Sequence, residues 1–228
     1  MIQMKNVYKK YPNGIVALNG LNVEIEQGEF VYIVGPSGAG KSTFIKMMYR
    51  EERPSSGQML VDGIDIATLK NKKVPLLRRQ MGVVFQDFKL LPRLNVYENV
   101  AFALEVIEES PAKIRERVLN VLDMVGLKHK ARMFPDELSG GEQQRISLAR
   151  SIVNKPKVVI ADEPTGNLDP ETSWEIMNLL EQINASGTTI LMATHNREIV
   201  NAMRHRVIAI EGGLIVRDVA GGDYGYEG

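Results

Sequence analysis

A glycine-rich loop sets the first limit on how this chain can fold. Gly35-Pro-Ser-Gly-Ala-Gly-Lys-Ser42 fits the pattern G-x-x-x-x-G-K-[ST]. It follows the apolar run 30–34, which predicts a buried strand, and it opens a predicted helix from Ser42 to about Arg50. A glycine-rich turn without function gives a similar pattern, but this strand and helix favour a phosphate-binding loop in an α/β protein.

This loop predicts a nucleoside triphosphate site. Backbone N–H groups turn inward around phosphate oxygens, and the helix N-terminus adds partial positive charge. We expect Lys41 to reach the β- and γ-phosphates and the Ser42 hydroxyl to ligate Mg²⁺. The predicted nucleotide-binding residues of this segment are Gly35, Pro36, Ser37, Gly38, Ala39, Gly40, Lys41, Ser42 and Thr43.

A second apolar run, residues 158–161, ends in two carboxylates, Asp162 and Glu163. Asp162 is placed to hold Mg²⁺, directly or through water, as a Walker B aspartate does. Because successive strand residues face opposite sides, we expect Glu163 to point away from Asp162 and to accept a proton from an attacking water. Two exposed acids before the turn 164–166 give the same pattern, and the phosphate loop in the same chain favours catalysis.

The amino-acid composition narrows the class of protein further. The 228 residues are 44% hydrophobic and 25% charged, which suits one large globular domain. The 28 basic and 28 acidic residues cancel, which disfavours binding to nucleic acid by bulk charge. The absence of cysteine excludes disulfides and thiolate zinc sites. We expect no signal peptide and no membrane span, so a membrane role would come through a partner.

The remaining pattern predicts a helical insert between two strand-rich parts. We expect a turn at 54–57, a hairpin at Asp62-Gly63 and a strand at 81–85. Residues 88–156 read as helices, one of which starts at Ser110-Pro111 and stops at Gly126. The later expected elements are helices at 170–185 and 197–203, strands at 188–193 and 206–210, and a frayed tail at 221–228.

The segment Leu138-Ser-Gly-Gly-Glu-Gln-Gln-Arg145 resembles the LSGGQ signature of the ATP-binding cassette (ABC) ATPases. Ser139 and Glu142 also fit a capping box, although Glu142 stands where the family more often has Gln. A capping box does not explain Gly140 and Gly141, which each cost about 1 kcal/mol relative to alanine in a helix. We expect them to let the backbone approach a γ-phosphate closely.

Other elements of the family pattern appear in order over nearly the whole chain. The resemblance implies that Tyr11 stacks on adenine, that Gln86 senses Mg²⁺, water and the membrane partner, and that His195 contacts the γ-phosphate. It also places Asp169 in the D-loop, although Asp169-Pro170 is a good helix cap in its own right. Tyr11 as a surface aromatic and Gln86 as an ordinary loop residue stay open.

The resemblance implies a fold and an assembly. The fold is a P-loop NTPase (RecA-like) core with an antiparallel β subdomain and an inserted helical subdomain. Residues 1–87 and 156–228 would form the core with the β subdomain, and residues 88–155 the helical subdomain that carries the signature. In the family, one subunit's signature completes the other's site, which implies a homodimer around two ATP and Mg²⁺, or a heterodimer with a similar chain.

Within the family, the segments 74–92, 95–105 and 193–196 resemble a branch that works in cell division. This implies a Mg²⁺-dependent ATPase, peripheral on the cytoplasmic face of the membrane at the division site. An integral membrane partner would link it indirectly to peptidoglycan hydrolases, with no nucleic acid involved. The alternatives are the ATPase of a lipoprotein-release or macrolide-export transporter, an ABC protein acting on DNA or ribosomes, and a binding module with a vestigial ATPase.

Two side-chain clusters have open interpretations. An apolar cluster after Gln86 either receives the coupling helix of a membrane subunit or fills the helical insert. A basic run before it either approaches anionic lipid or a partner, or is a solvated face. The apolar cluster consists of Phe88, Leu90, Leu91, Leu94 and Tyr97, and the basic run of Lys70, Lys72, Lys73, Arg78 and Arg79.

Overall fold

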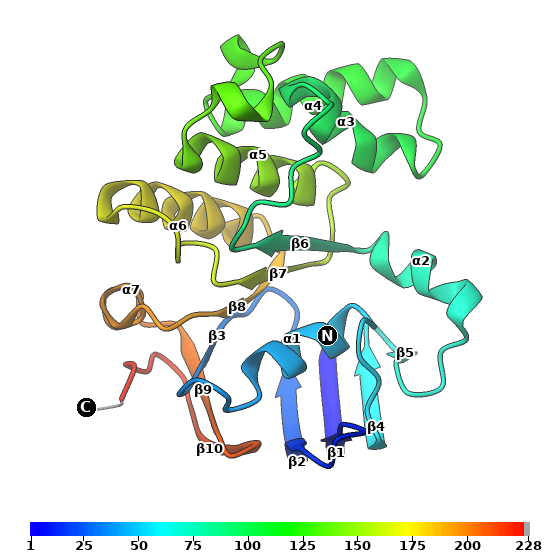
Figure 1. The fold of residues 1–228 in the computed structure, drawn as a ribbon, viewed down its shortest axis with the longest axis vertical. Coiled ribbons are helices and arrows are strands. Elements are labelled where there is room, and N and C mark those ends of the chain that lie inside the picture. Colours follow the sequence, from blue (N-terminus) through cyan, green and yellow to red (C-terminus); the bar gives the residue numbers. More distant parts are fainter. Residues whose placement is uncertain (226–228) are drawn as a thin grey trace.

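The computed structural model describes residues 1–225 and places a parallel sheet between a helical layer and an antiparallel sheet (Figure 1). The six-stranded sheet has the order β10-β9-β3-β8-β7-β6. All its neighbouring strands are parallel except β9 and β10. Its strands are β3 (Phe30–Val34), β6 (Met81–Phe85), β7 (Val158–Asp162), β8 (Thr189–Ala193), β9 (Arg206–Glu211) and β10 (Leu214–Val219).

The smaller sheet is antiparallel, with the order β2-β1-β4-β5. It comprises β1 (Ile2–Lys10), β2 (Val16–Ile25), β4 (Ser56–Val61) and β5 (Ile64–Asp65). The predicted hairpin at Asp62-Gly63 joins β4 to β5. The turn predicted at 54–57 is wrong in its second half, because Ser56 pairs with Tyr8 and already belongs to β4.

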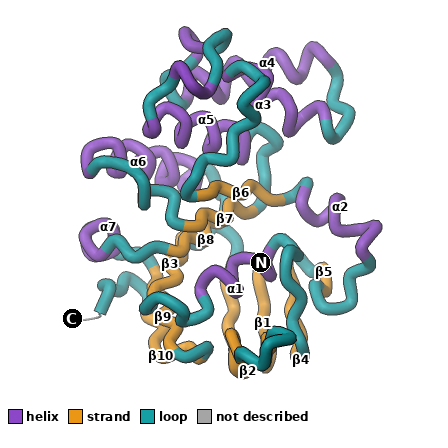
Figure 2. Tube along the Cα trace, in the orientation of Figure 1, coloured by secondary structure: helices purple, strands orange, loops and turns teal. Residues whose placement is uncertain are grey.

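The helices gather on one side of the molecule, apart from α1, α2 and α7 (Figure 2). Their bounds are α1 (Lys41–Met48), α2 (Val74–Arg78), α3 (Val96–Glu105), α4 (Pro111–Met124), α5 (Gly140–Ile152), α6 (Pro170–Ala185) and α7 (Arg197–Met203). Helices α3, α4 and α5 follow one another between β6 and β7. The division into a core at 1–87 and 156–228 and a helical part at 88–155 stays a prediction.

Strand β3 shows how the parallel sheet separates two hydrophobic cores. Phe30, Tyr32 and Val34 pack with α3 to α6, while Val31 and Ile33 pack with α1 and the antiparallel sheet. Successive side chains of a strand face opposite sides, so a strand covered on both faces is apolar throughout. All five residues of β3 are buried. This double cover fixes the strand that leads into the phosphate loop.

The C-terminal segment is not frayed as far as the structure describes it. The Tyr224 N–H donates to Asn201 Oδ1 at 2.7 Å, and Arg217 Nη2 donates to the carbonyl oxygens of Asp223 and Tyr224 at 2.6 and 2.7 Å. The prediction of a frayed tail is therefore wrong for residues 221–225, and residues 226–228 lie outside the described residues. Long-range contacts of this kind leave no trace in local composition.

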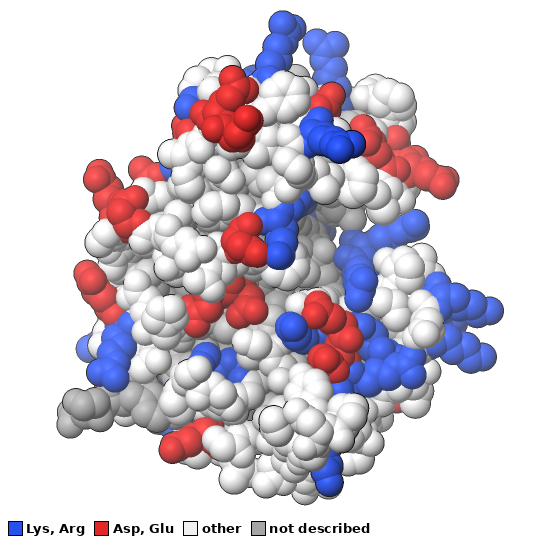
Figure 3. Space-filling view, viewed as in Figure 1, with Lys and Arg blue, Asp and Glu red and all other residues white. Residues whose placement is uncertain are grey.

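The two clusters with open interpretations differ in exposure. The five apolar side chains after Gln86 are all half-buried, and Leu90 and Tyr97 pack on the core beneath the helices. The five basic side chains are all exposed and lie around α2, on the right of Figure 3. Across residues 1–225, none of the helices combines the length and apolar character needed to cross a bilayer.

Candidate functional site

The phosphate loop connects β3 to α1 and lines a cavity of about 760 Å³. Its first residue, Gly35, has φ +143°, and a Cβ there would lie 2.0 Å from the carbonyl oxygen of Ile210. Only glycine fits this close approach to β9. Every residue from Gly35 to Thr43 lines the cavity, so the structure brings together the whole predicted loop.

Lys41 lies inside the curve of that loop. Its Nζ donates to the carbonyl oxygens of Gly35 and Pro36, at 2.7 and 3.0 Å. An ammonium group held there, together with the N-terminus of α1, creates a positive site suited to phosphate oxygens. The loop can therefore bind the polyphosphate of a nucleotide.

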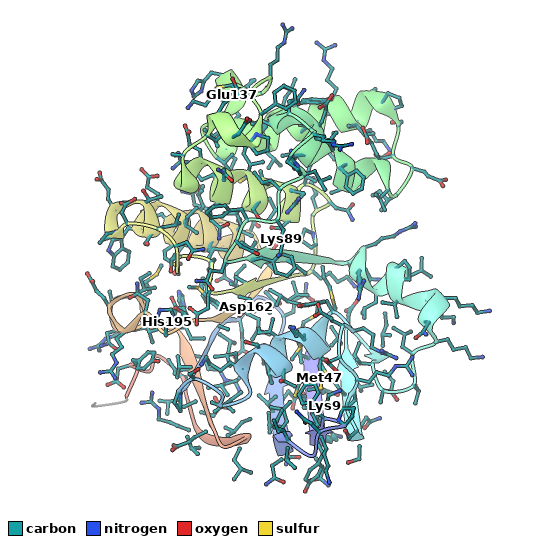
Figure 4. The ribbon with its side chains drawn as sticks, viewed as in Figure 1. Lys9, Met47, Lys89, Glu137, Asp162 and His195 are labelled. Atoms are coloured by element: carbon teal, nitrogen blue, oxygen red, sulfur yellow. The ribbon has the colours of Figure 1, made fainter. Side chains whose placement is uncertain are left out.

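The candidate site follows the order of strands in the sheet. The carboxyl ends of parallel strands meet at one edge, where ligands bind in open α/β sheets. Along the order β3-β8-β7-β6, the strands lead into the phosphate loop, His195, the Asp162 and Glu163 pair, and Gln86. Figure 4 labels Asp162 and His195, which lie near the middle of the molecule between the helical layer and the antiparallel sheet.

Asp162 and Glu163 line the same cavity, contrary to the expectation that they point apart. Asp162 is the last residue of β7, and Glu163 adopts φ +50°, so strand alternation no longer applies to it. Burial raises the pKa of the Asp162 carboxyl and the Glu163 charge adds to this, while Lys46 and Lys41 oppose it. A bound cation would stabilise the charged form of Asp162.

Glu163 and His195 form a pair. Glu163 Oε2 lies 2.8 Å from His195 Nδ1 and accepts the His195 backbone N–H at 3.2 Å. The glutamate side chain is only 18% exposed, whereas the histidine side chain is 66% exposed, and both residues line the cavity. A carboxylate held in this way can accept a proton, and the free end of the imidazole can meet a ligand.

The donor set fits Mg²⁺. The Ser42 hydroxyl and the Asp162 carboxylate line one cavity, and both are hard oxygen donors. Residues 1–225 contain no group of three or more acidic or histidine side chains arranged to hold a metal alone.

Tyr11 lines the cavity beside the phosphate loop. Its hydroxyl lies 3.1 Å from Thr43 Oγ1 in the phosphate loop, and Lys9 Nζ lies 4.9 Å from the ring centroid. The ring therefore lies beside the loop, as the adenine-stacking prediction requires. That role stays a prediction.

The other predicted site residues do not line this cavity: Gln86, Ser139, Gly140, Gly141, Glu142 and Asp169. Gln86 instead forms a reciprocal pair with Asn167. Its Nε2 donates to Asn167 Oδ1, and Asn167 Nδ2 donates to its carbonyl oxygen, both at 3.1 Å. Within one chain, Gln86 is therefore linked to the segment after β7 rather than to the phosphate loop.

The start of α5 is a complete capping box. Ser139 Oγ accepts the Glu142 N–H at 3.3 Å, and Glu142 Oε2 accepts the Ser139 N–H at 3.0 Å. The other carboxylate oxygen of Glu142 lies 2.6 Å from Lys130 Nζ, and this hydrogen bond is the largest cause that lowers the pKa of Glu142. In one chain, both side chains are thus occupied by structural contacts.

The two signature glycines differ in their surroundings. A Cβ at Gly141 would lie 2.3 Å from Thr172 Cγ2, whereas a Cβ at Gly140 would meet nothing nearer than 3.6 Å. Thr172 is held in turn by Asp169, which accepts its N–H at 3.0 Å and its hydroxyl at 2.6 Å. Close packing of α5 on α6 is therefore one reason for a glycine at 141. The approach of both glycines to a γ-phosphate stays a prediction.

The sequence motifs do not identify three structurally important residues, which are Gln144, Asn99 and Tyr224. Gln144 is buried, and its Nε2 donates to the carbonyl oxygens of Phe85 and Pro164, at 3.2 and 2.5 Å. It thereby ties α5 to the segments that follow β6 and β7. Asn99 is a buried polar residue on the apolar face of α3. A polar residue among the apolar positions of a helix is a signal that the sequence contains. Tyr224, from the C-terminal segment, lines the cavity, and no local pattern indicated it.

A family model described as ABC transporter matches residues 18–166. The chain belongs to the ABC transporter family. It is 71% identical over 225 residues to the cell division ATP-binding protein FtsE of Bacillus subtilis, covering 99% of both chains. FtsE of Streptococcus pneumoniae serotype 2 is 65% identical, with 100% of this chain and 99% of that one covered. For FtsE of Escherichia coli K12 the identity is 47%, with 93% and 96% covered.

Solved structures of the family agree with the fold. A dimeric structure of the bacterial ABC transporter cassette MJ0796 has a TM-score of 0.88 and 37% identity, covering 97% of this chain and 99% of that one. A dimeric post-hydrolysis state of the same cassette, bound to ADP and Pi, has a TM-score of 0.87 and 36% identity, with the same coverage. These matches confirm the predicted P-loop α/β fold class with its antiparallel and helical parts, and the ATPase class.

Proposed function

We propose that this chain is the ATP-hydrolysing subunit of an ABC-type complex that works in bacterial cell division. The observation that carries the proposal is one cavity that holds the phosphate loop, Asp162 and the Glu163–His195 pair. Near full-length similarity to FtsE from three different bacteria supports the cell-division role. The lipoprotein-release and macrolide-export alternatives are not favoured by these relatives.

The residues that line the cavity have different roles in ATP hydrolysis. Lys41 and the loop N–H groups bind the phosphates, and Tyr11 stacks on the adenine. Ser42 and Asp162 would hold Mg²⁺, which would supply neutralisation of phosphate charge. Glu163 accepts the proton of the attacking water, and the Glu163–His195 contact places the imidazole toward the γ-phosphate. Water then adds to the γ-phosphorus as the bond to the ADP oxygen breaks.

The remaining motif residues act across a dimer. Ser139, Gly140, Gly141 and Glu142 lie outside the cavity of their own chain, and each motif occurs once. We place them against the γ-phosphate of a second copy in a two-fold homodimer, with Asp169 at the contact between the two chains. In the closed dimer, Gln86 would supply a further oxygen donor to Mg²⁺. The dimeric structures of the cassette MJ0796 support this assembly.

The partner is an integral membrane protein resembling FtsX. Through it the chain is peripheral on the cytoplasmic face of the membrane at the division site, and ATP hydrolysis controls peptidoglycan hydrolases indirectly. The half-buried apolar cluster after Gln86 supports a docking role, because its side chains are only partly used by the core. Zero net charge agrees with a partner other than nucleic acid.

A pair of variants tests the chemistry. Lys41→Ala removes the ammonium group from the loop, and we expect loss of ATP binding measured with a fluorescent ATP analogue. Glu163→Gln keeps the loop, so we expect ATP binding to persist while phosphate release falls by at least about a hundredfold. Lys70→Ala, an exposed lysine outside the cavity, is the control. Unchanged turnover in Glu163→Gln would remove Glu163 from the role of base.

The membrane role is tested with the same trapped variant. Tagged Glu163→Gln protein with ATP is used to capture membrane proteins, which are identified by mass. Capture of a protein resembling FtsX, with cell-wall hydrolase components, is the expected result. Capture of a lipoprotein-release or export permease instead would leave the ATPase chemistry in place and refute the cell-division role.

A further inference from the structure

The C-terminal segment after β10 returns to the nucleotide cavity. Gly222 donates its N–H to the carbonyl oxygen of His205 at 3.0 Å, which turns the chain back toward α7. Two residues later, Tyr224 is only 6% exposed and lines the cavity together with Gly35, Glu163 and His195. The segment lies beyond residues 18–166, the range that the family model matches.

Tyr224 contacts two separate parts of the site. The backbone N–H of Gly35, the first residue of the phosphate loop, acts as a hydrogen-bond donor toward the Tyr224 hydroxyl and lowers the pKa of that hydroxyl. The Tyr224 ring lies 5.4 Å from the guanidinium carbon of Arg197, and its own N–H is bound by Asn201 at 2.7 Å. Arg197 begins α7 two residues after His195. One side chain therefore bridges the phosphate loop and the helix that follows the histidine.

Contacts outside the cavity hold Tyr224 in place. Arg217 in β10 binds two carbonyl oxygens of the segment through Nη2, and its Nη1 lies 2.9 Å from the Asp223 carboxylate. Burial raises the pKa of the Tyr224 hydroxyl, the Arg197 charge opposes this, and the Glu163 charge adds to it. The hydroxyl is therefore neutral at physiological pH and can both accept and donate a hydrogen bond.

We propose that Tyr224 is a positioning residue for ATP hydrolysis, which fixes the phosphate loop and α7 relative to each other. Docked in the cavity wall, it holds the Glu163–His195 pair at a set distance from the γ-phosphate. It acts through these groups and not on the reacting atoms, so the expected effect falls on kcat more than on nucleotide binding. This inference rests on the proposed ATPase function.

Steady-state ATPase kinetics of the full chain test the proposal. For Tyr224→Leu we expect kcat to fall about tenfold and KM for ATP to change less than about twofold, the size expected for losing one positioning hydrogen bond and its ring contact. Tyr224→Phe keeps the ring over Arg197, and we expect it to recover activity to within about threefold of wild type. Tyr32→Phe is the matched control, because it removes a buried tyrosine hydroxyl outside the cavity.

A second variant covers the case in which Tyr224→Leu does not fold. Arg217→Ala leaves the cavity intact and releases the segment from β10, so it should lower kcat in the same direction. Melting temperatures are measured for every variant. Unchanged kcat in both Tyr224→Leu and Arg217→Ala would overturn the proposal, and so would a rise in KM with kcat unchanged.

The wild-type protein separates this proposal from the one on which it rests. If wild type hydrolyses no ATP, the proposed function fails and this inference fails with it. If wild type is active and kcat responds to none of the segment variants, only the role of Tyr224 is refuted.

Discussion

The close packing of Gly141 against Thr172 predicts that an alanine at position 141 destabilises the protein. In Gly141→Ala the new Cβ would lie 2.3 Å from Thr172 Cγ2, more than 1 Å inside the normal contact distance of about 3.5–4.0 Å. Thr172 cannot rotate away freely, because its hydroxyl donates to Asp169 Oδ2 at 2.6 Å. Overpacking of this kind costs about 1–3 kcal/mol.

The neighbouring glycine provides the reference. In Gly140→Ala the nearest atom to the new Cβ is Phe88 Cζ at 3.6 Å, an ordinary contact. Both substitutions gain up to about 1 kcal/mol of helix propensity, so this gain cancels when the two variants are compared. We therefore expect Gly140→Ala to be more stable than Gly141→Ala by about 1–3 kcal/mol, measured by urea unfolding without nucleotide.

A double-mutant cycle identifies the cause. Thr172→Ser removes the clashing methyl group and keeps the hydroxyl that binds Asp169, and the nearest remaining atoms lie 3.5 Å from the new Cβ. In this background Gly141→Ala should no longer destabilise, which gives a coupling energy of about 1–3 kcal/mol. Equal stability of the two single variants, or a cost that persists in Thr172→Ser, would refute the packing explanation. ATPase activity of the relieved double variant then reports whether Gly141 also serves the nucleotide.

Three further predictions concern the start of α5, the nucleotide cavity and α3. Glu142→Gln should lose stability at pH 7, and the loss should shrink as pH falls through the lowered pKa of Glu142, because the Lys130 pair stabilises only the charged carboxylate; urea unfolding as a function of pH measures this. Asp162→Asn should raise the melting temperature of nucleotide-free protein at pH 7, because burial disfavours the charged carboxylate, and should abolish Mg²⁺-dependent ATP hydrolysis. Asn99→Leu should cost about 2–4 kcal/mol in urea unfolding, because its side chain binds carbonyl and N–H groups of the segment 91–95, which would lose their partner.

Elements with local signals were predictable from the sequence. Helix α6 occupies the predicted range 170–185, because Asp169 caps it with a hydrogen bond to the Thr172 N–H and Pro170 fits the first turn. Strand β3 also matches its predicted range, because a strand covered on both faces must be apolar throughout. The residues from Gly35 to Thr43 were found for a similar reason, since the motif itself requires a strand before it and a helix after it.

The remaining features depend on contacts between distant segments. The left-handed backbone of Glu163, which turns it into the cavity beside Asp162, follows from the turn after β7 and not from any periodicity. The pairing of Gln86 with Asn167 joins residues 81 positions apart. The return of Tyr224 to the cavity requires β10 and α7 to be in place first. No local pattern carries this information, because each of these contacts is created by tertiary packing.

The order of strands in the parallel sheet has a geometric consequence. Neighbouring strands lie about 4.8 Å apart, so the phosphate loop after β3 and Gln86 after β6 are separated by three strand spacings, or about 14 Å. His195 after β8, and the Asp162 and Glu163 carboxylates at the end of β7, occupy the two positions between them. The phosphate loop therefore lies at one end of this row of site residues, after β3. Helices α3 to α5 are connected at the other end, after β6. His195 and Glu163 therefore lie between the phosphate loop and the strand that leads into the helical layer.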